Sequence, residues 1–145
     1  MKLTKMMQYG LLLCLYVSRG GRITLGAASE SLNIPITFLE QIARRLRISG
    51  ILRSVRGPGG GYELSDGVTV GSVLKALGPI NLLESKDKIT YLHGTQEQKT
   101  FYNLVCSMED IMYTILNRKI INLCNEYALN QMKQLNGPSP SSKRN

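Results

Sequence analysis

Apolar residues recur at helical spacing through the first third of the chain. Residues 4–18 are apolar around most of their circumference, which is typical of a helix that is covered on two sides. A second helix is predicted over residues 25–32, because Thr24 stands where an N-cap is needed. A third is predicted over residues 36–49, with Gly50 as its C-terminal cap. Two helices joined by such a short turn indicate a helix-turn-helix.

The pattern then changes from helical to alternating. Residues 52–55 and 62–64 alternate apolar and polar side chains, as the two strands of a hairpin do. Residues 57–61 between them are four glycines and one proline, a composition that suits neither a helix nor a regular strand. A tight hairpin after a helix-turn-helix is a wing. We therefore expect a mainly α fold with a small β-hairpin wing, the winged helix-turn-helix.

Beyond the hairpin the apolar pattern weakens and then returns. Residues 69–77 predict a short helix, whereas residues 80–100 are polar and weakly patterned, which is typical of a loop. Two apolar seams follow, and the second is rotated by one residue, which predicts a kink or break at residues 117–119. The seams are Phe101, Val105, Met108, Met112 and Ile115, and then Leu116, Ile120, Leu123 and Tyr127.

These patterns divide the chain into four parts. We expect a DNA-binding domain over residues 1–77, a connecting loop over 78–100, a dimerisation helix segment over 101–135 and a disordered tail over 136–145. The third part is too apolar to stand alone in water, and the winged unit is too small to cover all of it. A second copy of the chain can cover the remaining apolar surface, so we expect a homodimer.

Positive charge is concentrated in the first half of the chain. The formal net charge is +8, and Lys and Arg outnumber Asp and Glu by nine to three over residues 1–64, against nine to seven over residues 65–145. Such a field favours nucleic acid or an anionic membrane surface. No run of about 18 apolar residues exists to span a membrane, and the opening residues lack a signal-peptide cleavage pattern. The wing, whose arginines can reach phosphate or a narrow minor groove, makes double-stranded DNA the expected partner, with no membrane.

Two groups of residues are candidates for contact with DNA. In a helix-turn-helix the first turns of the second helix lie nearest the bases. Here Gln41 can pair with adenine, Glu40 can accept a hydrogen bond from cytosine, and the arginines can bind guanine or phosphate. The helix candidates are Thr37, Phe38, Glu40, Gln41, Arg44, Arg45 and Arg47, and the wing candidates are Arg53, Ser54, Arg56, Gly59 and Gly60.

Each candidate also has a purely structural interpretation. Thr37 and Glu40 have the spacing of a capping box, in which the Glu40 carboxylate accepts from a backbone N–H. The three helix arginines are equally typical of a solvated charged face. Arg56 can be a surface arginine on a mobile loop, but the glycines around it favour a tip that approaches another polymer closely.

The cysteines and the single histidine are candidates for a sensor. Cys14, Cys106 and Cys124 form no Cys-x-x-Cys pair and are odd in number, which is typical of a reducing cytoplasm. Their apolar neighbours favour small buried side chains over ligands. His93 is expected to be solvated. No metal site is predicted, and Cys106 and His93 are the nearest to candidate ligands. The alternative function is a redox- or metal-sensing regulator that uses Cys14, Cys106, Cys124 or His93, or a regulator controlled by a docked protein partner.

An enzymatic function is not predicted. A nucleotide-binding loop needs Gly-Lys-Ser/Thr at the start of a helix, whereas Gly61 here leads into a strand. One histidine and no paired carboxylates leave no catalytic constellation. A protein-interaction module whose wing has lost contact with DNA is a third alternative.

Four segments occur together in a combination that is specific. They are Met-Lys-Leu-Thr at 1–4, Phe-Leu-Glu-Gln-Ile at 38–42, the stretch 46–52 and, most specifically, Ser-Val-Arg-Gly-Pro-Gly-Gly-Gly-Tyr at 54–62. They closely resemble the Rrf2 family of bacterial winged-helix regulators, whose members respond to iron–sulfur clusters, nitric oxide and cysteine metabolism. The resemblance is strong over residues 1–77 and weaker over residues 101–127.

The resemblance implies a mode of action. By the family pattern, the chain forms a homodimer whose long carboxy-terminal helices exchange across the two-fold axis, and it binds and usually represses a partly palindromic operator. Glu40, Gln41, Ser54 and Arg56 would read the sequence. Cluster-binding members carry three closely spaced cysteines before the long helix, but residues 87–103 contain none. No cofactor is therefore predicted, an iron–sulfur cluster is disfavoured, and a small molecule, a redox signal or a docked protein is the expected effector.

Overall fold

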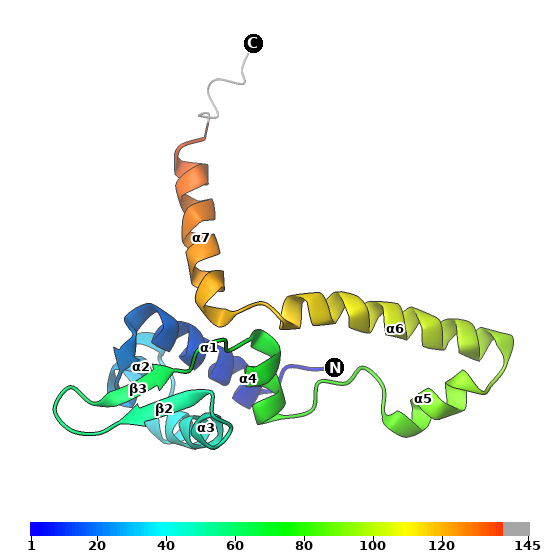
Figure 1. The fold of residues 1–145 in the computed structure, drawn as a ribbon, viewed down its shortest axis with the longest axis horizontal. Helices are drawn as coiled ribbons and strands as arrows, with labels where there is room; N and C mark the ends of the chain where they lie inside the picture. Colours follow the sequence, from blue (N-terminus) through cyan, green and yellow to red (C-terminus); the bar gives the residue numbers. More distant parts are fainter. Residues whose placement is uncertain (138–145) are drawn as a thin grey trace, which may run out of the picture.

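The computed structural model describes residues 1–137 of the chain. Over this range a compact winged unit (α1 to α4 with β1 to β3) carries an extended carboxy-terminal arm (α5 to α7), as Figure 1 shows. Residues 138–145 of the predicted tail lie outside the described part. The elements are α1 (Lys5–Gly20), β1 (Arg22–Ile23), α2 (Leu25–Leu32), α3 (Ile36–Ile48), β2 (Leu52–Val55), β3 (Gly61–Leu64), α4 (Val70–Leu77), α5 (Ser85–Leu92), α6 (Gln96–Leu116) and α7 (Ile120–Leu135).

Local caps set the ends of the first helices. The Thr4 hydroxyl accepts from the Met7 N–H and the Thr24 hydroxyl accepts from the Ala27 N–H, each at 3.2 Å. Helix α2 begins where predicted, and α1 begins one residue later than predicted, with Thr4 as its N-cap. Asn33 ends α2 in the left-handed conformation with φ of 53°. The predicted helix-turn-helix is confirmed.

The core of the winged unit lies between α1, α3 and α4. The inner face of α3 is completely buried at Leu39, Ile42, Ala43 and Leu46. These side chains meet the buried face of α1, which is also covered by α4 and, further along, by α7. The predicted double covering of the first helix is therefore correct.

Three short strands form one antiparallel sheet in the order β1-β3-β2. The predicted hairpin is confirmed, since Leu52 pairs with Leu64 and Val55 with Gly61. Strand β1 was not predicted from the sequence. It contains two residues, too few for an alternating pattern to be visible, and it pairs Arg22 with Glu63 and Ile23 with Tyr62.

The expectation of a loop over residues 80–100 is wrong. Helix α5 lies within that segment, and α6 begins at Gln96, where the Thr95 hydroxyl and the Gln98 side chain form a capping box. The two helices pack as an antiparallel pair through the Tyr91 and Phe101 rings, whose centroids lie 5.2 Å apart. Helix α5 has no buried residue, so its apolar pattern is weak, and its contact with α6 holds it in place.

The predicted break at residues 117–119 is confirmed and has a tertiary cause. Between α6 and α7, the Arg118 carbonyl accepts from the Val70 N–H and the Ile120 N–H donates to the Val68 carbonyl, both at 3.0 Å. Leu116 and Ile120, on either side of the break, are buried in the core. The chain is thus anchored to the winged unit here, and α7 leaves at a steep angle to α6 (Figure 1).

Cys14 is a buried core side chain, as predicted, and its burial lowers the reactivity of its thiol. It is 0% exposed, and burial raises the pKa of its thiol from 9.0 to about 12. At pH 8 its thiolate fraction is about a thousandfold lower than that of an ordinary cysteine. We expect iodoacetamide to modify the half-buried Cys106 and Cys124 first and to leave Cys14 intact in the folded protein, as mass spectrometry of the digested peptides would measure.

In urea all three cysteines should react alike. Alkylation of Cys14 in the folded protein at the rate of the other two would contradict this placement.

Candidate nucleic-acid interface

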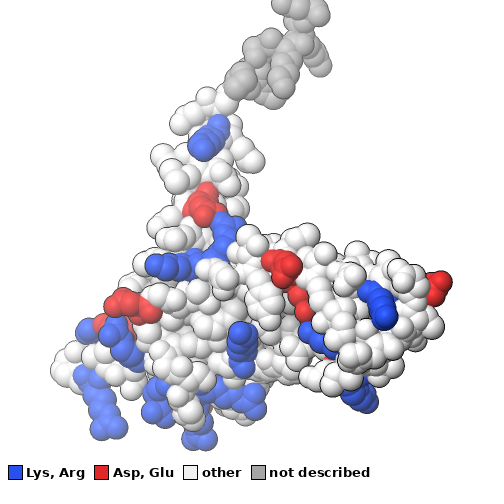
Figure 2. All heavy atoms as spheres, turned by 45° about the vertical axis from the view of Figure 1, so that its right-hand side comes forward, with Lys and Arg blue, Asp and Glu red and all other residues white. Residues whose placement is uncertain are grey.

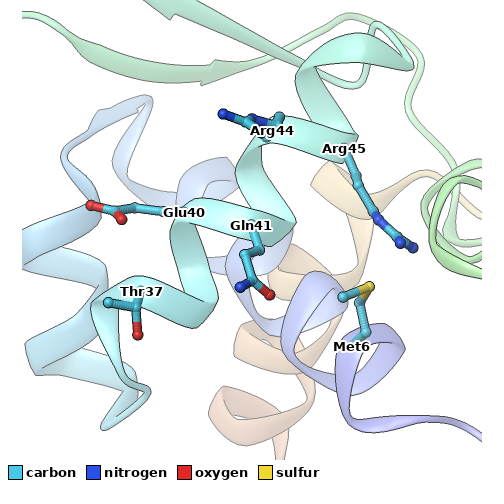
Figure 3. Close-up of a pocket in the computed structure, with 6 residues that line it drawn as sticks. All are labelled: Met6, Thr37, Glu40, Gln41, Arg44 and Arg45. Carbon is cyan, nitrogen blue, oxygen red and sulfur yellow. The ribbon is translucent and has the colours of Figure 1, made fainter.

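The exposed face of α3 forms one wall of a shallow hollow. Thr37, Glu40, Gln41, Arg44 and Arg45 recur every three or four residues and therefore point away from the buried stripe of the same helix. They line a hollow of about 470 Å³ together with one residue from α1, Met6 (Figure 3). The structure thus brings five of the seven helix candidates together, and it adds Met6, which the sequence pattern did not identify.

Helix α3 has no capping box, so that interpretation of Glu40 is wrong. Pro35 occupies the N-cap position without a side-chain hydrogen bond, and its carbonyl accepts from the Phe38 and Leu39 N–H groups at 3.1 Å. Thr37 is already inside the helix. Within residues 1–137 Glu40 forms no ion pair, so its carboxylate stays available to an external donor.

The helix arginines are exposed. Arg44 and Arg45 line the hollow, whereas Arg47 lies outside it. None of the three pairs with an acidic side chain in the described part of the chain. Figure 2 shows Lys and Arg side chains gathered along the lower edge of the winged unit, the edge where Figure 1 places α3 and the hairpin.

Phe38 lies at the border between the exposed and the buried face of α3. Its half-buried ring packs edge to face on Tyr9 of α1, with the centroids 5.3 Å apart, and it does not line the hollow. It precedes the fully buried Leu39 in the sequence and lies beside the buried stripe of the helix. Among the helix candidates, its placement is that of a packing residue.

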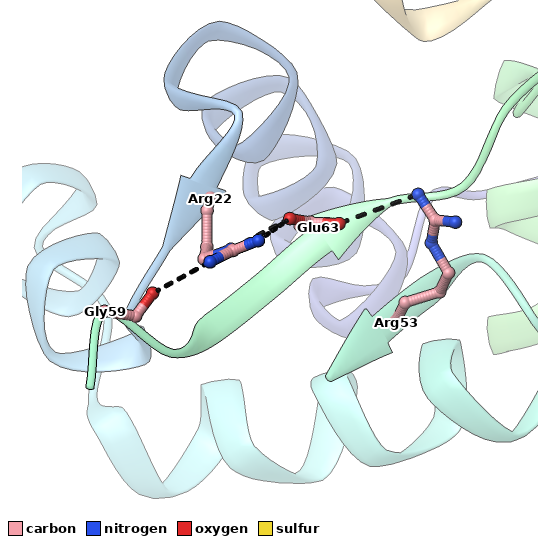
Figure 4. Close-up of polar contacts among 4 residues, drawn as sticks. All are labelled: Arg22, Arg53, Gly59 and Glu63. Carbon is pink, nitrogen blue, oxygen red and sulfur yellow. Dashed lines mark hydrogen bonds and ion pairs between the residues drawn. The ribbon is translucent and has the colours of Figure 1, made fainter. Parts of the chain in front are cut away.

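The two predicted cations of the hairpin differ in their ion pairing. Arg53, Ser54 and Arg56 are all exposed. Arg53, however, lies 3.7 Å from the Glu63 carboxylate, which also pairs with Arg22 of β1 (Figure 4). Arg56 pairs with no acidic side chain that the structure describes. No local signal in the sequence identified Arg22, because its role depends on the register of β1.

The glycines of the hairpin have structural roles within the chain itself. Gly57 and Gly59 have φ of 92° and 70°, in the region that other residues rarely adopt. A Cβ at Gly60 would overlap the Val55 carbonyl oxygen, and one at Gly61 would overlap that of Ile23. The backbone conformation of the hairpin therefore explains these glycines without any contact with another polymer. Gly59 is exposed and Gly60 half-buried, so both are accessible.

The candidate sensor residues lie in separate environments. Cys14 is in the core, His93 is exposed at the end of α5, and the Cys124 thiol lies 3.9 Å from the Leu15 carbonyl oxygen of α1. The neighbouring Cys106 side chain raises the pKa of Tyr102. Nearby, the Lys88 ammonium donates to the Glu109 carboxylate at 2.8 Å, which raises the pKa of Lys88.

An iron–sulfur cluster needs about four protein ligands, usually thiolates. Among residues 1–137 no three Cys, His, Asp or Glu side chains converge as metal ligands. The one cysteine in the core also holds its proton strongly. The described residues of a single chain therefore do not fit such a cluster. None of the helices that the structure describes is both long and apolar enough to cross a membrane.

Curated proteins similar to this chain are transcriptional regulators. An HTH-type transcriptional regulator of Haemophilus influenzae is 39% identical over 83 residues, which are 53% of this chain and 55% of the relative. The regulator IscR of Erwinia tasmaniensis is 41% identical over 83 residues, which are 53% of this chain and 50% of the relative. The chain spans about half the length of the curated relatives it matches.

Solved structures extend the similarity into the arm. A transcriptional regulator from Listeria innocua matches with a TM-score of 0.69 and 29% identity over 86% of this chain and 87% of that one. CymR, the global cysteine regulator of B. subtilis, matches in fold with a TM-score of 0.67 and 22% identity over 88% of this chain and 98% of that one.

These comparisons test two expectations from the sequence. The relatives are regulators, which confirms the expectation that the chain is not an enzyme. A model of the Rrf2 family, described as iron-dependent transcriptional regulators, matches residues 3–124. The match covers most of the chain, including the winged unit, the whole of α6 and the start of α7, and the chain therefore belongs to the Rrf2 family of transcriptional regulators.

Proposed function

We propose that the protein is a sequence-specific DNA-binding regulator that acts in the cytoplasm as a homodimer and represses transcription from a partly palindromic operator. The main support is the set of exposed cations on α3 and on the wing. Helix α3, which exposes this polar face, contacts β2 of the wing, and the cations of both elements, apart from Arg53, pair with no acidic side chain in residues 1–137. Side chains that are charged, exposed and unpaired are suited to an external polyanion.

The hollow on α3 supplies groups for base recognition. Glu40 offers acceptors only and Gln41 offers both a donor and an acceptor, so together they suit base edges in the major groove. Thr37, Arg44, Arg45 and, beside the hollow, Arg47 are suited to guanine or to the phosphates that fix the register of the protein. Phe38 contributes by holding α3 on α1.

The wing supplies a second point of contact. Arg56 sits at the start of an exposed glycine-rich tip and, with Arg53 and Ser54, is suited to phosphates or to a narrow minor groove. Gly59 and Gly60 carry no side chain, so their backbone can approach DNA closely. Because α3 contacts β2 of the wing, both contacts would form in a single docking geometry.

The arm supports a homodimer. The outward face of α6 carries an apolar stripe that includes Leu104, Met108 and Ile111, which are 58%, 50% and 68% exposed. Phe101 and Ile115 extend the stripe at the same spacing. A helix of 21 residues is about 30 Å long, so the stripe would cost much free energy if left in water. A second copy related by a two-fold axis covers both stripes at once.

The proposal assigns no metal to the chain. The family is described as iron-dependent, but the described residues of one chain do not fit a cluster, so the effector is a small molecule, a redox signal or a docked protein. The test is selection from a random duplex library, followed by affinity measurements over a range of salt concentrations. A steep salt dependence and an enriched motif with two half-sites are expected. Failure to enrich any motif would contradict the proposal.

Arg56→Ala is expected to weaken binding to the selected duplex by about 10- to 100-fold, because one arginine contact with DNA is lost. The fold and the assembly state should not change, since the side chain is exposed and pairs with no acidic side chain in the described residues. Fluorescence anisotropy with the labelled duplex measures the change. The control is Lys99→Ala, which removes the same charge from the exposed surface of α6. Equal losses in both variants would show a general charge effect and contradict the wing contact.

A further inference from the structure

The sheet places three charged side chains in one row. Arg22 of β1 lies directly opposite Glu63 of β3, and Glu63 lies directly opposite Arg53 of β2. Side chains that are direct cross-strand neighbours point to the same face of a sheet. The Glu63 carboxylate therefore lies between two guanidinium groups, with one oxygen facing each of them (Figure 4).

The two pairs differ in strength. Arg22 donates through Nε to Glu63 Oε1 at 2.8 Å, and its Nη2 forms an ion pair with the same oxygen at 2.6 Å. Arg53 Nη2 lies 3.7 Å from Glu63 Oε2, beyond an ordinary hydrogen bond. Arg22 is therefore held by Glu63, whereas Arg53, which is more exposed, is only attracted by it.

Arg22 also reaches the tip of the wing. Its third nitrogen, Nη1, donates to the Gly59 carbonyl oxygen at 3.3 Å. One planar guanidinium thus bridges the Glu63 carboxylate of β3 and the backbone of the tip, and all three of its nitrogens are used. Lysine carries its donors on one nitrogen and cannot reproduce this planar fork of three nitrogens.

The tip has few other restraints. Between the strands, the described backbone makes one turn hydrogen bond, from the Gly60 N–H to the Gly57 carbonyl at 2.9 Å. Glycine loses more conformational freedom than any other residue when it is ordered. A tip that is ordered before binding does not lose that freedom on the DNA, which favours affinity.

We propose that Arg22 and Glu63 form a positioning pair that orders the wing tip and so places Arg56 for contact with DNA. The inference rests on the proposed function and adds two residues to it, neither of which needs to touch DNA. It also accounts for the Glu63 carboxylate between the two arginines of the sheet. On charge alone Glu63 would repel phosphates, but through Arg22 it holds the tip in place.

Two variants separate this role from a simple effect of charge. Glu63→Gln makes the protein one charge more positive, so electrostatics alone predicts tighter binding to any duplex. The positioning pair predicts instead that affinity for the selected duplex falls by roughly fivefold, while binding to a scrambled duplex is unchanged or tighter. Arg22→Lys keeps the charge and should cause a similar fall. The control is Glu126→Gln, which removes the same charge from the exposed ion pair with Arg118 on the arm.

Two further measurements test the mechanism. In the protein without DNA, the heteronuclear NOEs of the Gly59 and Gly60 amides should fall in Glu63→Gln and Arg22→Lys but not in the control. In a double-mutant cycle, Glu63→Gln should add little to the loss caused by Arg56→Ala, because it acts through that residue. Additive losses would overturn the inference.

The outcomes distinguish this inference from the proposed function. If the wild-type protein enriches no duplex, the proposed function fails. If the wild-type protein binds its duplex and Glu63→Gln binds that duplex equally well or better, with unchanged tip amides, only the positioning pair fails. Weaker specific binding together with more mobile tip amides supports both.

Discussion

Replacing Leu104 and Ile111 by glutamate is expected to convert the proposed homodimer into a monomer and to remove binding to the full operator. Both side chains are more than half exposed on α6, so the isolated chain should tolerate the change. Across a two-fold interface each substitution is present twice, and four carboxylates would be buried without partners. A protein that grips one half-site instead of two loses on the order of 10²- to 10⁴-fold in affinity.

Sedimentation equilibrium and anisotropy with the selected duplex measure the two effects. The control is Ser107→Glu with Thr114→Glu, which has the same spacing and charge on the polar exposed face of α6. The control should remain dimeric and bind DNA. A monomeric wild-type protein, or a doubly substituted protein that stays dimeric, would refute the assignment of this stripe to the dimer interface.

The second large effect is expected at Gly61, where β3 begins. A Cβ there would overlap the Ile23 carbonyl oxygen of β1, and the φ of 150° disfavours a side chain as well. Gly61→Ala should therefore displace β1, expose the buried Ile23 and separate Arg22 from Glu63. We expect a loss of about 3 kcal/mol in the free energy of unfolding, together with a loss of operator affinity larger than that of Arg56→Ala.

Urea unfolding followed by circular dichroism measures the stability. Gly26→Ala is the matched control, because this glycine lies on the exposed side of α2 with nothing within 4 Å of an added Cβ. It should raise stability by about 0.5–1 kcal/mol, since alanine favours the helix. A Gly61→Ala protein as stable as the wild type would mean that β1 does not pack on β3 as described.

The helices of the winged unit could be predicted because their signals are local. The predicted range of α2, residues 25–32, is that of the structure, since Thr24 caps one end and Asn33 ends the other. The exposed face of α3 could be predicted for the same reason, because the helical period places Gln41 opposite Leu39 and Ala43. The hairpin followed from its glycines and its alternating flanks.

The arm could be predicted only in part. The break before α7 was visible as a change of phase in the apolar pattern. The predicted apolar seam of α6, however, contains residues from a covered face and from an exposed face of the helix. Val105 is 6% exposed, whereas Met108 is 50% exposed. A periodic pattern shows that a helix has apolar residues, but α4 and α5 determine which of them are covered.

By itself, then, the sequence determined where most helices and the hairpin begin and end, because caps, glycines and periodicity act over a few residues. Only the tertiary structure decided that Arg22, Arg53 and Glu63 meet in one row, that Phe38 faces Tyr9 and that Glu40 caps nothing. Those outcomes depend on the register of β1 and on how α1 packs against α3. Neither is encoded in any local pattern, because the residues that meet lie up to 41 positions apart in the chain.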